Sequence, residues 1–160
     1  MNKLSIVQAS YIAGFIDADG SLIAQIVSRE DYNLKFQIKV SVLCIQKINR
    51  IHHLKDFQSE IGTGTVRDRG DGIAELAIVG QKNVFEFLQQ IKPYLRNKKK
   101  QANLILRICE QLNQIKNNPQ KFLELCELAD HVAVLNDSKT RTNTTETVKK
   151  VFLRLGLIEN

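Results

Sequence analysis

Two aspartates, Asp17 and Asp19, close an apolar helical pattern that lies near the N-terminus. A carboxylate at the C-terminal end of a helix is unfavourable by about 0.3–1 kcal/mol, because the helix dipole already places partial negative charge there. A divalent cation would offset this cost, since Mg²⁺ is commonly held by one or two carboxylates together with water and substrate phosphates. The alternative is that Asp19 and Gly20 only begin a turn, for which both residue types are suited.

The same helix carries a strip of small residues that ends in the first of these acids. Ser10, Ala13, Gly14 and Asp17 recur at i, i+3, i+4 and i+7 and therefore share a face. Small side chains let two helices approach closely, although such residues also pack under sheets. Two abutting copies of this helix would bring two Asp-terminated ends together, as in a two-metal site for phosphodiester cleavage.

The elements that must position these acids follow from periodicity. Alternation of apolar and polar residues predicts strands over 21–29, 34–42, 63–69 and 73–79. Helical spacing predicts helices over 48–58 and 81–91, which end near Gly62 and Pro93. We therefore expect an α+β fold, in the order helix-strand-strand-helix-strand-strand-helix, with a four-stranded antiparallel sheet that is covered by helices on one face and bare on the other.

Three more helical patterns follow the basic run at 96–100, and a polar connector at 135–143 separates the last two of them. No low-complexity segment or interdomain linker interrupts the chain. We expect a single domain over residues 1–160, with a core at 5–95 and a C-terminal helical part at 98–157.

Charge and the bare sheet face both favour a polyanionic partner. Lys and Arg number 23 against 17 Asp and Glu, which gives a net charge of +6 and a pI near 9.3. The side chains expected on the bare face are mostly cations and amides, namely Gln25, Arg29, Lys35, Gln37, Lys39, Ser41, Arg67 and Arg69. Such a face can contact phosphates and base edges, although any exposed antiparallel sheet has a polar face. No phosphate-binding loop, nucleophile elbow or membrane-spanning run is present, so neither a small-molecule substrate nor a membrane is expected.

At this point a family resemblance becomes visible. The stretch Tyr-Ile-Ala-Gly-Phe-Ile-Asp-Ala-Asp-Gly at 11–20 resembles the signature of the LAGLIDADG homing endonucleases, in particular the single-motif, homodimeric group of green algal chloroplast introns. Further blocks at 45–47, 66–70, 98–103 and 135–141 follow in the order of that family. The resemblance implies motif helices that form a dimer interface and sheets that form a saddle on DNA.

The resemblance also implies roles for individual residues near the motif. Asp19 is expected to bind the catalytic metal together with the backbone carbonyl of Ala18, the metal being Mg²⁺ with Mn²⁺ able to substitute. Gln46 and Lys98 are expected around the metal and its water, and Arg50 is expected to support the same pocket. Asp17 is expected to be structural, at the helix interface.

Other positions match residues that contact DNA in the family. The expected base-reading positions are Gln25, Arg29, Tyr32, Gln37, Lys39, Arg67, Arg69 and Glu75. Lys139 and Arg141 match a loop that contacts the DNA backbone. Val27 and Leu43 stand where polar residues are often found, so they are expected to contact thymine methyl groups or nothing.

We therefore expect an enzyme of intron mobility that hydrolyses one phosphodiester in each strand of a partly palindromic target of about 20 base pairs, the length that two copies of such a sheet would cover. The alternative is a non-cleaving relative that binds DNA or RNA, such as an intron maturase. The expected compartment is an organelle, the chloroplast first, with the mitochondrion or an archaeal cytoplasm as alternatives.

Overall fold

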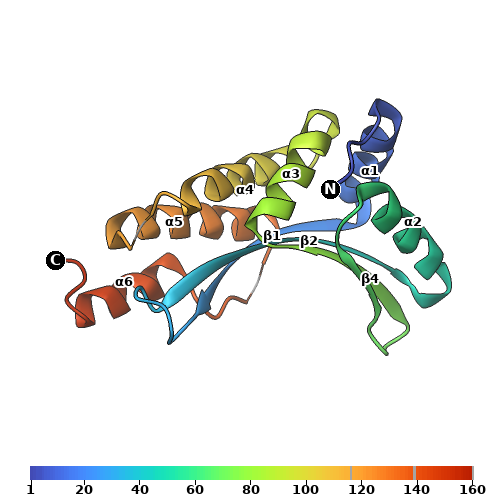
Figure 1. Cartoon of the computed structure of the whole chain (residues 1–160). Coiled ribbons are helices and arrows are strands. Elements are labelled where there is room, and N and C mark those ends of the chain that lie inside the picture. Colours follow the sequence, from blue (N-terminus) through green and yellow to red (C-terminus); the bar gives the residue numbers. More distant parts are fainter. Residues whose placement is uncertain (116, 139, 160) are drawn as a thin grey trace.

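Four strands pair antiparallel in the order β1-β2-β4-β3, within a computed structural model that describes residues 1–115, 117–138 and 140–159. The strands are β1 (Gly20–Ser28), β2 (Phe36–Lys47), β3 (Thr65–Asp68) and β4 (Ile73–Val79). The sheet curves strongly, and the helices lie on its convex side (Figure 1). The expected α+β class and order of elements are confirmed.

Helices cover one face of this sheet in two groups. The helices are α1 (Ile6–Asp19), α2 (Ile51–Ile61), α3 (Gln81–Ile91), α4 (Lys99–Leu112), α5 (Pro119–Leu135) and α6 (Thr145–Arg154), with short 3-10 turns η1 (Ile48–Arg50) and η2 (Lys92–Tyr94). Figure 1 shows α1 and α2 over one end of the sheet and α4 to α6 toward the other. Among the described residues, every helix is too short or too polar to cross a lipid bilayer.

The two faces of the sheet follow directly from side-chain alternation. Leu22, Ala24 and Ile26 of β1 are buried under the helices, while Gln25 between them is exposed. In β2 the even-numbered residues from Phe36 to Cys44 are buried in the same way. No helix of the described residues covers the opposite face, which we call the open face (Figure 1).

The strand β2 is longer than its periodicity predicted. It continues five residues past Val42 to Lys47, because Leu43, Cys44 and Ile45 form an apolar run that hides the alternation. It also begins later, at Phe36, because Lys35 adopts a left-handed conformation with φ of 60° in the turn. The longer strand carries Gln46 beside the end of α1.

Candidate functional site

The helix α1 passes straight into β1, and this junction places Asp19 at the end of the sheet. Gly20 accommodates the junction, because a Cβ atom there would lie 2.8 Å from the Cα of Ile16. Gly20 also pairs with Cys44 of β2, so Gln46 comes beside Asp19. The Gln46 Nε2 donates to Asp19 Oδ2 over a long 3.4 Å, and the Asp19 carboxylate is exposed. The structure therefore brings these two predicted site residues together.

Lys98 makes a reciprocal contact with Asp17, which lies two residues before Asp19 in the last turn of α1. The backbone amides of Arg96 and Lys98 donate to the Asp17 carboxylate at 2.6 and 2.9 Å, while Lys98 Nζ donates to the Asp17 carbonyl oxygen at 2.7 Å. The carboxylate thus holds the segment just before α4, and the ammonium lies at the C-terminal end of α1, where positive charge is favourable for the helix dipole. Burial raises the pKa of Asp17, but the amide hydrogen bonds from the 96–98 segment outweigh it and lower the pKa overall.

The remaining predicted residues of this pocket, Ala18 and Arg50, are near Asp19 and Gln46 in the sequence. Arg50 is exposed at the end of η1, directly after the Gln46-bearing strand, and no polar contact within the described part of the chain joins it to Asp19. Ala18 is exposed in the last turn of α1. These two residues keep the roles expected from the resemblance as predictions.

The donors at the end of α1 suit a hard divalent cation. Asp19 offers a carboxylate and Ala18 a backbone carbonyl, and oxygen ligands of this kind are those that Mg²⁺ prefers. Nowhere in the described ranges do three or more His, Cys, Asp or Glu side chains gather as a metal-binding group. A cation here would therefore take its further ligands from water, phosphate or a second copy of the chain.

The structure divides the small-residue strip of α1 between two faces of the helix, and its place in a dimer interface stays a prediction. Ala13 is fully buried in the core of its own chain, and the Asp17 carboxylate is occupied by the start of α4. Gly14 and Ser10 are exposed, and no atom of the described residues lies within 4 Å of a Cβ built on Gly14. The residues that share the outer face of α1 are Ile6, Val7, Ser10, Tyr11, Gly14 and Ala18.

This outer face of α1 is unusually apolar for a surface. Ile6, Val7 and Tyr11 are 71%, 78% and 64% exposed. The helix has no polar side to face solvent, which is typical of a helix buried on both sides. The exposed face is therefore suited to contact another apolar surface.

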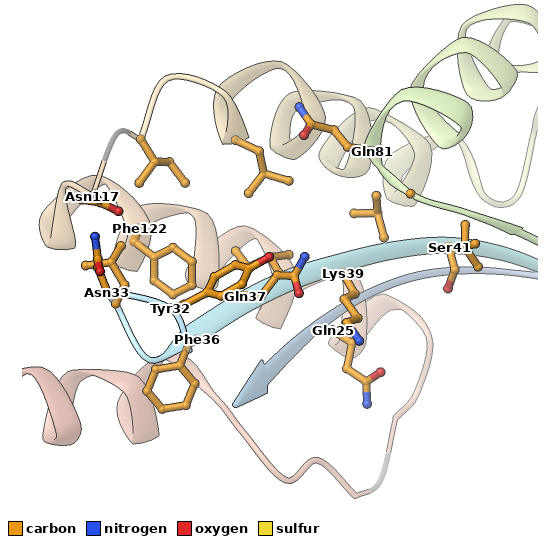
Figure 2. Close-up of a pocket in the computed structure, with 17 residues that line it drawn as sticks. Gln25, Tyr32, Asn33, Phe36, Gln37, Lys39, Ser41, Gln81, Asn117 and Phe122 are labelled. Atoms are coloured by element: carbon orange, nitrogen blue, oxygen red, sulfur yellow. The ribbon is translucent and has the colours of Figure 1, made fainter. Parts of the chain in front are cut away.

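The open face of the sheet carries the base-reading residues that we predicted on β1 and β2. Gln25 pairs directly with Lys39 across the strands, and Figure 2 shows both side chains on the same side of the sheet. Arg29 NH1 donates to Gln37 Oε1 at 3.1 Å, and its guanidinium lies 4.5 Å from the centre of the Tyr32 ring. Arg29 also forms an ion pair with Asp31 at 2.7 Å, which the prediction did not include.

A cavity of about 730 Å³ opens beside the β1–β2 hairpin (Figure 2). Gln25, Tyr32, Gln37 and Lys39 line it from the sheet, and apolar residues line it from the α4–α5 side, namely Leu112, Ile115 and Phe122. The predicted reading residues at this end of the sheet therefore border a hollow rather than a flat surface.

The pairing of β3 with β4 gives Glu75 surroundings that differ from those expected of a base-reading residue. It lies directly opposite Arg67, whose Nε and NH2 approach Glu75 Oε1 at 3.0 and 2.8 Å. The Glu75 side chain is only 8% exposed, whereas that of Arg67 is 65% exposed. Glu75 is thus better placed to orient Arg67 than to contact DNA itself. Arg69 is exposed and pairs with Asp71 at 3.1 Å.

Beyond Val27 and Leu43, which were expected on the open face, sequence reasoning missed how apolar the centre of this face is. The apolar residues on it are Ile23, Val27, Leu43, Ile45, Ala77 and Val79. Val79 is 58% exposed and Ile45 is 43% exposed. The signal was available in β4, because Ala77 and Val79 follow Glu75 at the period of two that places all three on one face.

The two predicted backbone-contacting residues of the connector have different outcomes. Lys139 lies outside the described residues. Arg141 donates through NH1 to Asp130 Oδ1 of α5 at 2.7 Å, so its guanidinium is engaged within the chain. A DNA contact through this guanidinium would have to share it with Asp130.

Comparison with known proteins gives matches over nearly the whole chain. The pattern of the family described as LAGLIDADG endonuclease matches residues 12–109. DNA endonuclease I-CreI of Chlamydomonas reinhardtii is 47% identical over 142 residues, which cover 89% of this chain and 86% of that protein. DNA endonuclease I-CvuI of Chlorella vulgaris is 44% identical over 147 residues, which cover 92% and 91%.

Solved structures show the same fold. A crystal structure of I-CvuI in complex with the I-CreI target, with 2 mM Mg and DNA not cleaved, matches with a TM-score of 0.91 and 41% identity over 96% of this chain and 97% of that chain. Another I-CvuI complex, with its own target, contains Ca. The archaeal intron-encoded homing endonuclease I-Vdi141I, complexed with DNA, shares the fold with a TM-score of 0.82 at 18% identity, over 95% and 98% of the two chains.

Proposed function

Because this chain belongs to the LAGLIDADG endonuclease family, we propose that it is a homing endonuclease that makes a double-strand break in a long, partly palindromic DNA target. The observation that carries this proposal is the position of Asp19, whose exposed carboxylate stands at the edge of the open, basic sheet face with Gln46 beside it and Lys98 fixed nearby. A protein that only binds DNA has no need for this combination.

The reaction is hydrolysis of a phosphodiester with the help of a divalent cation, which we propose to be Mg²⁺ with Mn²⁺ able to substitute. When bound, such a cation lowers the pKa of an attacking water and stabilises the charge that builds on the phosphate and the leaving oxygen. Asp19 and the carbonyl of Ala18 would hold it. No covalent intermediate with the protein is required.

Two further side chains would prepare the phosphate and the water. Gln46 can donate and accept hydrogen bonds at the same time, which suits a residue that orients a water beside the Asp19 carboxylate. The ammonium of Lys98 would lie near the scissile phosphate, because it is anchored to the Asp17 carbonyl. Arg50, at the neighbouring end of η1, would add a second cation to the same pocket.

Cutting both strands requires two such sites, and we propose that a homodimer supplies them. The exposed apolar face of α1, with Gly14 and Ala18 near its C-terminal end, would meet the same face of a second copy. The contact is closest where the side chains are smallest, so it brings the two Asp19 residues toward the twofold axis. The whole chain would act as one unit, with the part at 98–157 covering the sheet and supplying Lys98.

Base reading would fall to the open face. Gln25, Gln37 and Arg67 have side chains that can form paired hydrogen bonds with base edges, while Arg29, Lys39 and Arg69 add positive charge toward phosphates. Tyr32, whose ring packs against the Arg29 guanidinium, would contact the outer part of the target. Val27 and Leu43, with the other apolar residues of this face, would contact thymine methyl groups.

The place of action that we propose is an organelle of a green alga, the chloroplast first. The support is that both related endonucleases come from green algae. Expression of the native gene followed by cell fractionation would test it.

The test of the proposed function is cleavage with recovery of the cut site. The protein would be incubated with Mg²⁺ and plasmids whose inserts vary around the I-CreI target found in the I-CvuI complex. We expect linear products with cuts in both strands at one family of sequences, and no products when the cation is chelated. Binding to selected sequences without any cutting in Mg²⁺ or Mn²⁺ would instead identify a non-cleaving binder.

A further inference from the structure

The strand β2 extends past the end of β4 and leaves part of its own edge without a neighbouring strand. It pairs with β1 over residues 36–44, but with β4 only over residues 41–47. At the end of β4, Gly80 adopts a φ of 89° and turns the chain into α3. Residues 36–40 of β2 therefore have a strand on one side only, and we call their other side the free edge of β2.

The hydrogen-bond pattern shows which backbone groups face the free edge. Along an antiparallel strand, alternate residues direct their N–H and C=O groups toward the same neighbour. The Val40 carbonyl accepts from the Gly80 amide at 3.4 Å, on the side of β4. Phe36 and Ile38 alternate in step with Val40 and direct their backbone groups to the same side. Within the described part of the chain, no hydrogen bond occupies the amides and carbonyls of Phe36 and Ile38 on this side.

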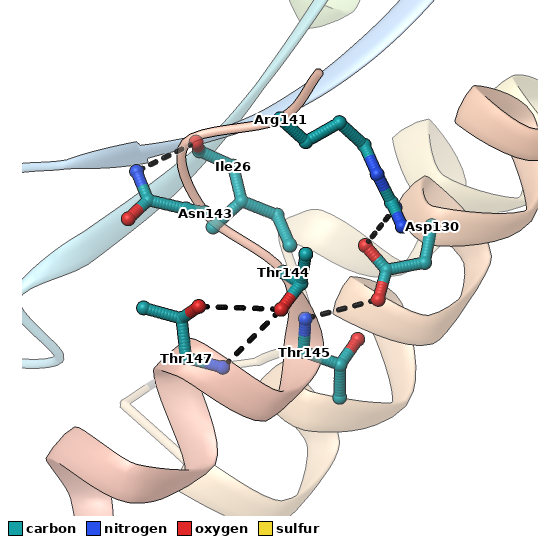
Figure 3. Close-up of polar contacts among 7 residues, drawn as sticks. All are labelled: Ile26, Asp130, Arg141, Asn143, Thr144, Thr145 and Thr147. Atoms are coloured by element: carbon teal, nitrogen blue, oxygen red, sulfur yellow. Dashed lines mark hydrogen bonds and ion pairs between the residues drawn. The ribbon is translucent and has the colours of Figure 1, made fainter. Parts of the chain in front are cut away.

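The outer edge of β1 shows how such groups are covered elsewhere in the sheet. There, the connector between α5 and α6 supplies Asn136, whose Nδ2 donates to the Leu22 carbonyl at 2.7 Å. Asn143 Nδ2 donates to the Ile26 carbonyl at 3.2 Å in the same way (Figure 3). A strand edge without this kind of cover is a template for pairing with another chain. The free edge of β2 is therefore able to accept a further strand.

The cavity of about 730 Å³ beside the β1–β2 hairpin lies along the free edge and has room for such a strand. Leu112, Ile115 and Phe122 form its apolar side, below α4 and α5 (Figure 2). A segment of five residues laid along the free edge would extend about 16 Å and direct alternate side chains into this apolar side. Branched apolar residues such as valine suit these positions.

Charge on the open face selects among extended segments. Lys39 lies on the free edge, and its side chain is exposed on the open face. A residue directly opposite Lys39 on an added strand would share that face, and an acid there would form a favourable cross-strand pair. A second copy of the free edge would instead gather two Lys39 side chains on one face, which is unfavourable. The charge therefore favours an acidic partner over a second copy of this chain.

We propose that the free edge of β2 is a docking site for an extended segment of a partner protein in which apolar residues alternate with acidic ones. The segment would run antiparallel to β2, in the place that a longer β4 would occupy. Hydrogen bonds to the backbone of Phe36 and Ile38 would supply affinity, and the alternation of side chains would supply specificity. One consequence rests on the proposed function: acids docked on the open face would oppose DNA binding at this end of the sheet.

The test measures binding of dye-labelled, capped peptides to the full chain by fluorescence anisotropy, without DNA. The probe is the peptide Val-Glu-Val-Glu-Val. The same peptide with an N-methyl group on its central valine keeps every side chain but cannot donate to the Ile38 carbonyl. We expect this methylated peptide and the peptide Val-Lys-Val-Lys-Val each to bind at least about tenfold more weakly than the probe.

A change of charge at the free edge tests the role of Lys39. Lys39→Glu is expected to bind the lysine peptide more tightly than the glutamate peptide, which reverses the preference of the wild type. The matched control is Arg69→Glu, which changes the net charge equally. The Arg69 amide donates to Ile73, which pairs with Lys47 at the far end of β2. The control is expected to keep the preference of the wild type.

Amide hydrogen exchange followed by NMR locates the bound peptide. We expect exchange at the Phe36 and Ile38 amides to slow by at least about tenfold, while the Gln37 amide, which faces β1, changes little. Failure of the wild type to bind the probe, or equal binding of the methylated peptide, would overturn the proposal. Slower exchange at the same two amides on raising the protein concentration alone would identify a second copy as the occupant and would also overturn it. Because DNA is absent throughout, these results are independent of whether the proposed function holds.

Discussion

Asp17 and Asp19 are two residues apart on one helix, and their different neighbours give them different tasks. The Asp17 carboxylate accepts from the amides of Arg96 and Lys98 just before α4, whereas among the described residues the Asp19 carboxylate accepts one long hydrogen bond, from Gln46. A group that already accepts short hydrogen bonds is held in place, while a group left open can bind something else. The first acid therefore fixes Lys98, and the second is available to a cation.

Replacing Asp17 by Asn should lower the stability of the protein in a pH-dependent way. Asn cannot accept both amide hydrogen bonds as an anion does, so we expect a loss of about 1 kcal/mol near neutral pH. Because the folded protein lowers the pKa of Asp17 below its ordinary 3.8, the stability from its charged form is present above that value and is lost as the pH falls through the lower folded pKa.

Urea unfolding from about pH 6 down to about pH 3 measures this effect. The wild type should lose stability with acid more steeply than Asp17→Asn, so the two curves should converge. A difference between them that stays constant over the whole range would contradict the assigned role of the carboxylate.

The Arg67–Glu75 pair allows a second test at the scale of single residues. Arg67→Ala leaves the nearly buried Glu75 carboxylate without its partner, so we expect a loss of about 1–2 kcal/mol in the free energy of unfolding. The double variant Arg67→Ala/Glu75→Ala removes the unpaired charge and should be more stable than Arg67→Ala alone. Thermal unfolding of the three proteins checks this, and equal or lower stability of the double variant would refute it.

The residue scale also shows what the sequence could predict of the site and what it could not. The acid at the helix end could be named in advance from the motif, and Gln46 from the order of blocks in the family resemblance, although periodicity ended the predicted strand before Gln46. The hydrogen bonds that Asp17 accepts from the segment before α4 and the burial of Glu75 could not, since both depend on contacts with segments 79 and 8 residues away that only the fold brings together.

At the scale of elements, α1 is the helix with two apolar faces, each of which is suited to pack against another apolar surface. Its inner face is in the core, and its outer face leaves Ile6, Val7 and Tyr11 exposed. Helical spacing placed Ser10, Ala13, Gly14 and Asp17 on one strip, and in the structure these residues straddle the two faces of α1. Which small residue points outward depends on the rotation of the helix about its axis, and sequence does not set this when every side is apolar.

Gly14→Leu should weaken association of two chains without weakening the fold. Leu favours a helix by about 1 kcal/mol over Gly, and the space around Gly14 is open within one chain. In a close helix pair the added bulk should cost about 1–3 kcal/mol, which is a roughly tenfold to hundredfold weaker dimer.

Sedimentation over a range of concentrations measures this association. The matched control is Lys150→Leu, which adds a bulky apolar side chain to the exposed part of α6, far along the chain from α1. The control should sediment as the wild type does. A Gly14→Leu protein that dimerises as tightly as the wild type would place the interface elsewhere.

Some strand and helix boundaries can be predicted from neighbouring residues in the sequence, whereas others depend on contacts that form only in the folded sheet. The helices at 81–91 and from Pro119 begin or end where Gly, Pro or a cap signals it, so sequence placed them well. The five extra residues of β2 were not predicted, because their apolar run is explained only by a strand that is buried on one face and carries Leu43 and Ile45 on the other.

At the scale of the whole molecule, the length of the sheet sets the length of DNA that it can cover. The 12 residues of β2 extend about 40 Å, which corresponds to about 12 base pairs at 3.4 Å each. Two copies related by a twofold axis should protect about 20–24 base pairs with partial palindromic symmetry. Hydroxyl-radical footprinting measures this, and a protected region of half that length would indicate that a single chain binds.

The most direct test of the central claim is to compare wild type with Asp19→Asn on one target DNA in Mg²⁺, measuring binding and cleavage side by side. Because Asn is nearly isosteric but carries no charge, we expect binding within a few-fold of the wild type and cleavage of both strands slower by at least about 100-fold. Gln8→Asn, a similarly small polar change at the opposite end of α1, should leave cleavage nearly unchanged. Cleavage by Asp19→Asn at the rate of the wild type would contradict the assignment of this aspartate to the metal.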